Sequence, residues 1–514
     1  MRLADYLLEL SPEVRRSIAW QVRNQDEVRS WTWLDVERLT TSAAEFLLDH
    51  SVRPGDRVVN LGGNSFAWAI LDLACSAINA VHVPIDPRFS AVQKEHCLES
   101  VMPTVVFTDS NANSQHMSLL QLDSLAPSKK TLADVSCSFE PNDLANILFT
   151  SGTTGSHRGV MLSHGNLVSN AHAKLDAMPQ SPSDRRLNFL PFSHAYARTC
   201  ELTTWLISYS CIEVARGIDG VLEYARASQP TLINGVPVFY SRLASKWAEM
   251  GSSHSDLHQM LGSRIRRLAS GGATLENVLR ARFESAGLPI FQGYGLTESS
   301  PVICSNRSAV GIGEPNLAEV GPPVAGVQIK IDNDSRLWVA GSGVMLGYWN
   351  DPEATRSKLV DGWLDTGDLA ERVGNEERNL SQGAIRILGR ADDTIVLNSG
   401  YKVQPLPIEQ IIGAQEWVSQ CLLIGTGYPF PILVLLPKSV YDKCVPTSDE
   451  MLARVESLLS HYPTYAIPRK LILVQEPWTY ENGTTNFKGG LIRSRIHAMV
   501  QDRIQQSLEI TPCR

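Results

Sequence analysis

Apolar runs of strand length alternate with stretches of helical pattern from residue 57 to residue 292. Residues 57–61 (RVVNL) are typical of a strand, residues 65–77 have the length and composition of a helix, and residues 81–85 are typical of the next strand. Strands that alternate with helices predict a mostly parallel sheet whose faces are covered by helices. The series continues with strand-like segments at 104–108, 146–150, 231–235, 267–270 and 289–292.

The pattern changes after about residue 320. Short β-patterned segments separated by Gly, Pro, Asn and Asp predict a β-rich subdomain, and the charged stretch at 390–393 marks a domain boundary. Beyond it, strand-like and helical segments alternate again and predict a compact α+β domain. We therefore expect an α/β protein with an N-terminal domain at 1–390 and a C-terminal domain at 391–514. The segments are strands at 327–331, 336–340, 384–388, 394–397, 420–424 and 432–436, and helices at 406–414 and 450–460.

Composition excludes several classes of protein. The 514 residues are too many for one core, and the net charge of −8 argues against a nucleic-acid partner. No apolar run reaches the ~18 residues of a membrane-spanning helix, so we expect no integral membrane segment. Charged residues interrupt the N-terminus, so we expect no secretory signal. Nine scattered cysteines without CxxC pairs indicate reduced thiols in a cytoplasmic protein.

A loop rich in Gly, Ser and Thr follows the strand-like segment at 146–150. Residues 150–155 (TSGTTG) are followed by Arg158 and Gly159, and a helical pattern begins after Ser163, a candidate N-cap. Glycines allow close approach of the backbone to an anion, while hydroxyl and basic side chains supply donors. The loop therefore predicts a phosphate site, although an ordinary strand-to-helix turn has the same composition. It is not a Walker A loop, because the Gly-Lys pair is absent.

Further motifs follow in a fixed order. With this loop, they make the chain resemble the adenylate-forming superfamily of acyl-CoA synthetases, luciferases and nonribosomal adenylation domains. The motifs are Gly271-Gly272-Ala273, GYGLTE from Gly293 to Glu298, DTGD at 365–368, GRADD at 389–393, and Lys488.

The resemblance implies a nucleotide site. The loop would hold the β- and γ-phosphates with Arg158, which stands where relatives usually carry Lys and so changes the donor geometry. Tyr294, in its Gly293–Gly295 turn, would contact adenine, and Gly272 with Ala273 would form the wall beside it. Asp368 and Arg390 would bind the ribose hydroxyls. The loop residues concerned are Thr150, Ser151, Gly152, Thr153, Thr154 and Gly155.

The resemblance also implies the catalytic groups. Thr297 would lie near the α-phosphate, Glu298 would bind Mg²⁺, and Lys488 would bridge the carboxylate and the α-phosphate during adenylation. Gly489-Gly490 follows Lys488 where relatives often continue with a basic or aliphatic run.

A third group of residues is expected on the acyl and CoA side. His194 and Gly271 would border the acyl group, although His194 is equally compatible with a structural role. Asp392 would be the hinge about which a mobile C-terminal domain rotates. That rotation would bring Gly400 and Tyr401 inward to line the thiol tunnel.

The implied function is ATP-dependent activation of a carboxylic acid to acyl-AMP, then transfer to the thiol of CoA. Segments 190–199 and 404–409 resemble the long-chain fatty acid–CoA ligase branch, which favours a fatty acid, while the short chain leaves a medium-chain or aryl acid open. Two alternatives remain: an acyl-AMP ligase that delivers to acyl carrier protein, and a weakened paralogue that only binds nucleotide or acyl groups.

Overall fold

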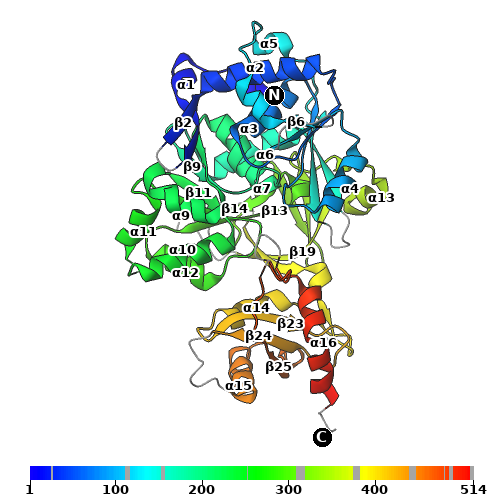
Figure 1. The fold of residues 1–514 in the computed structure, drawn as a ribbon. Coiled ribbons are helices and arrows are strands. Elements are labelled where there is room, and N and C mark those ends of the chain that lie inside the picture. The colour runs from blue at the N-terminus through cyan, green and yellow to red at the C-terminus, as the bar shows by residue number, and fades with distance from the viewer. Residues whose placement is uncertain are drawn as a thin grey trace.

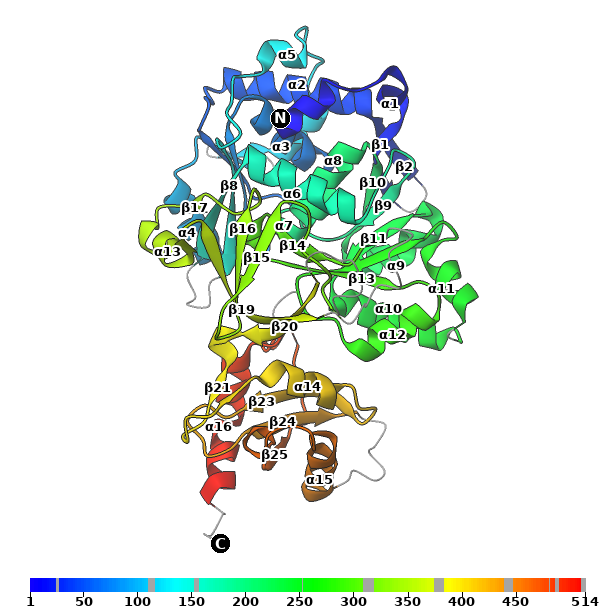
Figure 2. The same ribbon diagram turned by 180° about the vertical axis from the view of Figure 1, so that it is seen from behind.

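The computed structural model describes residues 1–24, 27–109, 116–151, 157–251, 253–307, 319–373, 383–438, 447–479, 481–485 and 490–509. A large N-terminal body is joined to a smaller C-terminal body (Figure 1, Figure 2). Both bodies combine helices with β-sheets, which confirms the predicted α/β class with a large sheet domain and a small second domain.

An eight-stranded sheet forms one half of the N-terminal body. Its inner strands are parallel, and the outermost pair at each end is antiparallel. The strand order is β14 (Val302–Ser305), β13 (Ile290–Gly295), β12 (Arg267–Ser270), β11 (Leu232–Gly235), β9 (Arg185–Asn188), β10 (Cys211–Val214), β1 (Ile18–Asn24) and β2 (Glu27–Thr32).

A seven-stranded sheet forms the other half. Strands β3 to β7 pair in parallel, whereas β7 with β8 and β8 with β17 are antiparallel. Together the two sheets confirm the predicted mostly parallel arrangement, and the strands expected from the sequence begin within two residues of their predicted starts. The order is β17 (Gly347–Tyr348), β8 (His157–Ser163), β7 (Leu144–Ser151), β4 (Val81–Pro84), β3 (Arg57–Asn60), β5 (Val105–Thr108) and β6 (Met117–Ser118).

The segment after the glycine-rich loop folds differently from the sequence expectation in one respect. The predicted helix is present as α6 (His164–Ala177), and Ser163 caps it by accepting a hydrogen bond from the backbone N–H of Asn166 at 3.1 Å. Before it, however, the chain forms strand β8, which returns antiparallel to β7. Most residues of β8 are buried, with Arg158 and Met161 half-buried, and this segment was not predicted as a strand.

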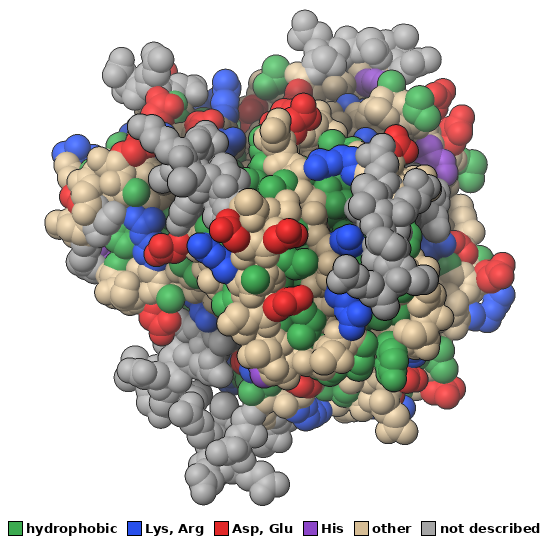
Figure 3. Space-filling view, turned by 90° about the horizontal axis from the view of Figure 1, so that it is seen from below, with side chains coloured by type: hydrophobic (Ala, Val, Ile, Leu, Met, Phe, Trp, Pro, Cys, Tyr) green, Lys and Arg blue, Asp and Glu red, His purple; other side chains and the backbone are tan. Residues whose placement is uncertain are grey.

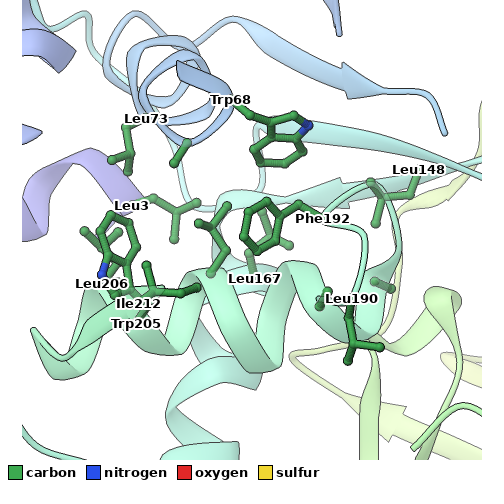
Figure 4. Packing of buried hydrophobic residues seen from close by; sticks show 14 of the residues in the cluster. Leu3, Trp68, Leu73, Leu148, Leu167, Leu190, Phe192, Trp205, Leu206 and Ile212 are labelled. Carbon is green, nitrogen blue, oxygen red and sulfur yellow. The ribbon is translucent and has the colours of Figure 1, made fainter. Parts of the chain in front are cut away.

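Helices cover both sheets and fill the space between them. Helix α6 lies between the sheets in both views (Figure 1, Figure 2). Its Leu167 joins a buried cluster in which Phe192 lies against Trp68, with ring centroids 5.3 Å apart (Figure 4). The helices of this body are α1 (Pro12–Arg16), α2 (Trp33–Asp49), α3 (Phe66–Ala77), α4 (Ala91–Val101), α5 (Leu132–Val135), α6, α7 (Ala195–Ala197), α8 (Thr204–Ser208), α9 (Gly217–Ser228), α10 (Pro237–Glu249), α11 (His254–Leu261), α12 (Asn277–Ser285) and α13 (Pro352–Lys358).

A five-stranded antiparallel sheet follows in the chain and confirms the β-rich segment predicted after residue 320. Strand β19 is central and pairs with β16, β18 and β20. Because β20 ends at Arg390, this sheet leads directly to the C-terminal body. The strands are β15 (Val327–Ile331), β16 (Arg336–Gly341), β18 (Leu359–Val360), β19 (Trp363–Val373) and β20 (Ala384–Arg390).

The C-terminal body has its own buried clusters. The largest cluster of the N-terminal body takes its residues from positions between Leu3 and Ile385. Two clusters of the C-terminal body take theirs from positions between Ile395 and Ala466 and between Leu422 and Ile504. The elements are β21 (Ile395–Val396), β22 (Lys402–Val403), α14 (Pro405–Gly413), β23 (Val418–Ile424), β24 (Ile432–Pro437), α15 (Ser448–Leu458), β25 (Lys470–Leu473) and α16 (Arg493–Glu509).

The surface and the thiols agree with the composition. Among the described residues no helix has both the length and the apolar character needed to cross a membrane. Acidic and basic side chains are interspersed on the face seen in Figure 3. All seven cysteines within the described ranges are free thiols, and six of them are buried.

His164 makes stability depend on pH. It is fully buried at the start of α6, its Nε2 lies 3.0 Å from Asn79 Oδ1, and burial lowers its pKa to about 4. The unfolded chain therefore binds a proton at higher pH than the folded chain does. The stability contributed by the neutral imidazole is fully present above about pH 6.5 and is lost as the pH falls towards 4.

We predict that the H164Q substitution reduces this loss of folding stability at low pH. Urea unfolding between pH 7 and pH 4 should show a smaller decrease in the free energy of unfolding than in the parent, by up to roughly 3 kcal/mol. H50Q, at an exposed histidine, is the control and should keep the parent's pH dependence. An unchanged pH dependence in H164Q would contradict the assignment.

Candidate active site

A cavity of about 1050 Å³ lies where strand ends of the N-terminal body meet the C-terminal body. Its walls come from the β7–β8 hairpin, the ends of β12 and β13, the turn at Thr297–Ser299, and Arg390 at the end of β20. The motifs that are scattered through the sequence are therefore brought to one place by the fold. The expected site residues that line the cavity are Thr150, Arg158, His194, Gly271, Gly272, Gly293, Tyr294, Gly295, Thr297, Glu298, Arg390 and Asp392.

Other expected residues lie elsewhere or are not described. Asp368 lies directly behind the lining, hydrogen-bonded to Tyr294 and Arg390. Ala273 is not among the residues that line the cavity. Lys488 and residues 152–155 lie outside the described residues, and only the backbone of Ser151 is described.

Asp368, Arg390 and Tyr294 form one hydrogen-bonded group. Asp368 and Arg390 are cross-strand partners on β19 and β20, with Arg390 Nη1 donating to Asp368 Oδ1 at 3.0 Å. The Tyr294 hydroxyl donates to the other carboxylate oxygen, Oδ2. Burial raises the pKa of Asp368, while the charge of Arg390 and the Tyr294 hydrogen bond oppose that rise. Burial also raises the pKa of Tyr294, and the adjacent carboxylate adds to the effect.

A second group surrounds Glu298. The Tyr348 hydroxyl donates to Glu298 Oε1 at 2.9 Å, and the Arg158 guanidinium lies 5.7 Å from the centroid of the Tyr348 ring. Arg158 also approaches Asp351, with Nε 3.5 Å from Oδ2. Burial and the Glu298 carboxylate together raise the pKa of Tyr348, so its hydroxyl remains a donor. These contacts hold one carboxylate and one guanidinium on the same wall of the cavity.

His194 belongs to a third group. Its Nε2 lies 2.8 Å from Asp86 Oδ2, and Arg88 also binds both oxygens of Asp86. Although burial opposes ionisation, hydrogen bonds from Arg88 and His194 hold the pKa of Asp86 well below its usual range. His194 therefore borders the cavity with its ring oriented by a carboxylate.

Two positions in the cavity wall require glycine, because neighbouring atoms lie too close for a side chain. A Cβ atom at Gly271 would lie 2.9 Å from the Tyr196 ring, which forms part of the cavity wall. A Cβ atom at Gly295 would overlap the backbone oxygen of Pro301. Side chains at these positions would push the surrounding wall, so glycine sets the width of the cavity here.

The C-terminal body contributes residues on either side of position 488. Glu481, Gly483 and Thr485 precede it, Ile492 and Arg495 follow it, and all five line the cavity.

The segment at 400–401 lies outside the cavity lining. Tyr401 is exposed and stacks on Tyr465 with ring centroids 4.3 Å apart, and neither Gly400 nor Tyr401 lines the cavity.

Several cavity residues were not predicted from the sequence. Tyr348, Asp86, Arg88 and Lys358 come from segments without a recognised motif. Lys174 carries a signal that could have been used, because a charged residue occupies the face of α6 expected to be apolar. Helical spacing places Lys174 on the same face as Ala171 and Met178.

Comparison with known proteins gives matches along both bodies. Residues 12–349 match the family model described as "AMP-binding enzyme", and residues 392–509 match the one described as "AMP-binding enzyme C-terminal domain".

Individual relatives match over most of the chain. Long-chain-fatty-acid–CoA ligase FadD15 of Mycobacterium bovis is 28% identical, covering 76% of this chain and 74% of its own. Feruloyl-CoA synthase of Amycolatopsis sp. is 29% identical, covering 84% and 88%. The crystal structure of ATP-bound MatB from Rhodopseudomonas palustris has a TM-score of 0.81 at 23% identity, covering 98% of this chain and 100% of that chain. This last likeness shows that the fold is shared.

We predict that Y294F destabilises the N-terminal body. Without the hydroxyl, the buried Asp368 carboxylate loses a donor, which should lower the free energy of unfolding by about 1–2 kcal/mol in urea titrations. Y401F removes an exposed hydroxyl and should change it by less than about 0.5 kcal/mol. Equal effects of the two substitutions would contradict the role of Tyr294 as a donor to Asp368.

Proposed function

Because the chain belongs to the AMP-binding enzyme family, we propose that it activates a carboxylic acid with ATP and transfers the acyl group to CoA. The broader prediction of an acid–thiol ligase is confirmed by the family and by the CoA ligases among its relatives. The observation that carries the specific proposal is the single cavity that gathers the ordered motifs and the segments flanking Lys488.

The nucleotide occupies the part of the cavity near Asp368. The two carboxylate oxygens of Asp368 accept bonds from the ribose hydroxyls, and the charge of Arg390 favours the ionised form of that carboxylate. The Tyr294 ring stacks on adenine, with Gly272 forming the adjacent wall. The loop at 150–155 and Arg158 bind the β- and γ-phosphates. Support comes from the hydrogen-bonded group of Tyr294, Asp368 and Arg390 at one wall.

Glu298 is the residue that fits a magnesium ion. The described residues contain no cluster of three or more His, Cys, Asp or Glu side chains suited to a metal. Mg²⁺ needs only one or two carboxylates when nucleotide oxygens and waters complete its shell, so Glu298 with the triphosphate is sufficient. When bound, the ion supplies charge neutralisation on the phosphates. Tyr348 orients the carboxylate through its hydrogen bond to Oε1.

Two half-reactions follow from this arrangement. In the first, a carboxylate oxygen of the acid forms a bond to the α-phosphorus and pyrophosphate leaves with the bonding pair. The Lys488 ammonium and the Thr297 hydroxyl stabilise the charge that develops on the α-phosphate oxygens. In the second, the thiol sulfur bonds to the acyl carbon, the thiol proton is lost and AMP leaves.

The second half-reaction requires rotation of the C-terminal domain. We assign residues 1–390 to the domain that binds nucleotide and acid, and residues 391–514 to a mobile lid with Asp392 as the hinge. In the present orientation the segments around Lys488 face the cavity, which suits adenylation. Rotation would bring Gly400 and Tyr401 to the thiol tunnel in their place.

A direct assay can identify the acid and the acceptor. ATP–pyrophosphate exchange over fatty, aryl and dicarboxylic acids identifies the acid, and released thioester identifies CoA as acceptor. Both fatty and aryl acids are included, because the relatives named for them match this chain at similar identity. ATP binding without exchange for any acid would contradict the enzymatic function and favour a weakened paralogue. Transfer only to acyl carrier protein would contradict the CoA assignment.

We predict that K488A separates the half-reactions. Exchange should fall at least about 100-fold because the α-phosphate loses its cation, while thioester formation from supplied acyl-adenylate should stay near the parent rate. K129A, at an exposed lysine, is the matched control and should leave both rates unchanged. Equal loss of both half-reactions in K488A would contradict the assigned role.

We predict that Y348F lowers adenylation about 10-fold, because Glu298 loses the donor that orients it. The measurement is kcat/KM in the exchange assay at several Mg²⁺ concentrations, with the loss largest at low Mg²⁺. Y224F, on α9, should match the parent. A loss in Y348F that is the same at every Mg²⁺ concentration would count against the link to Glu298.

A further inference from the structure

Lys174 is a buried lysine that the proposed reaction does not use. It lies near the end of α6, is only 5% exposed, and lines the cavity together with Cys200, Ala269 and Val302. These neighbours are small and mostly apolar. A lysine is rarely buried to this extent without a partner of opposite charge.

The partners of Lys174 are neutral. Its Nζ lies 3.0 Å from Ser305 Oγ and 2.9 Å from Met178 Sδ, a weak acceptor. The Ser305 hydroxyl donates to the backbone oxygen of Asn306 at 2.9 Å, which leaves its oxygen free to accept from Lys174. Within the described part of the chain, no carboxylate forms an ion pair with Lys174, and burial lowers its pKa. When Lys174 is protonated, its ammonium therefore has a desolvation cost that no charged group in the described part of the chain offsets.

The position of Lys174 relative to the reacting end follows from the helix. Asn170, one turn earlier on α6, donates to the backbone oxygens of Ser299 and Val302 and so holds the turn that carries Thr297 and Glu298. Four residues of helix advance by about 6 Å, so Lys174 lies one turn away from that contact. Because Thr297 and Lys174 line the same cavity, an acid whose carboxylate reacts near Thr297 can place its other end at Lys174.

We propose that Lys174 determines substrate specificity by pairing with a second carboxylate at the far end of the acid, so that the substrate is a dicarboxylic acid. This inference rests on the proposed function. An unsubstituted fatty chain would place methylene groups against the ammonium and leave its charge without a partner, which is costly in a buried site. A second carboxylate supplies that charge and fills the third donor position of the lysine.

Matched acids test the proposal. Each α,ω-dicarboxylic acid from four to ten carbons is compared with the monocarboxylic acid of equal carbon number, using kcat/KM in ATP–pyrophosphate exchange. We expect the parent enzyme to prefer the dicarboxylic member of at least one pair by about 10-fold or more. In K174M, that preference should be lost through a fall of about 100-fold for the dicarboxylic acid, mainly in KM, with the monocarboxylic acid little changed. K174R should retain part of the preference, and K129M should match the parent.

The ratio of the kcat/KM values for two acids, measured on one variant, does not depend on how much of that variant is folded. Preference of the parent for the monocarboxylic member of every pair would overturn the proposal while leaving the ligase function intact. So would an equal loss for both acids in K174M. Absence of exchange with every acid would instead contradict the proposed function, and the inference would fall with it.

Discussion

The ion pair between Asp368 and Arg390 is the interaction on which the site depends. It joins β19 to the last residue of β20, and through the Tyr294 hydroxyl it also holds β13 of the eight-stranded sheet. Burial opposes ionisation of both groups, but the charge of Asp368 raises the pKa of Arg390, and the charge of Arg390 opposes the rise that burial causes in the pKa of Asp368. One buried carboxylate thus connects two sheets at the point where the chain passes to the C-terminal body.

Much of the architecture could be predicted from local patterns. Buried parallel strands are continuous apolar runs, and for this reason β3, β4, β11 and β12 begin close to where the sequence indicates. The N-cap of α6 could be predicted at Ser163, because the side chain of an N-cap residue accepts a hydrogen bond from the first turn of its own helix. Strand β8 was missed because a basic residue and glycine interrupt its apolar pattern, and its place is set by pairing with β7.

In the site, too, the residues of local motifs could be predicted, whereas their contacts with residues distant in sequence could not. Motif residues such as Glu298 and Arg390 could be named from the sequence, since their types and order are characteristic of a family. Their partners could not, because Tyr348 reaches Glu298 across 50 positions and Lys174 reaches Ser305 across 131. The width of the cavity at Gly271 depends on the Tyr196 ring, a contact that exists only in the folded chain. The length of the chain left a medium-chain or aryl acid open beside a fatty acid, whereas the dicarboxylic acid that we propose rests on the buried side chain of Lys174, which only the fold places in the cavity.

In the function that we propose, one cavity binds the nucleotide at Asp368 and the acid between Gly271 and Lys174. The most direct measurement is a crystal structure with a hydrolysis-resistant analogue of a dicarboxylic acyl-adenylate. We expect the ribose hydroxyls to bind the Asp368 carboxylate and the distal carboxylate of the ligand to bind Lys174 Nζ. A ligand bound with its ribose away from Asp368, or with its acyl group directed away from α6, would contradict it.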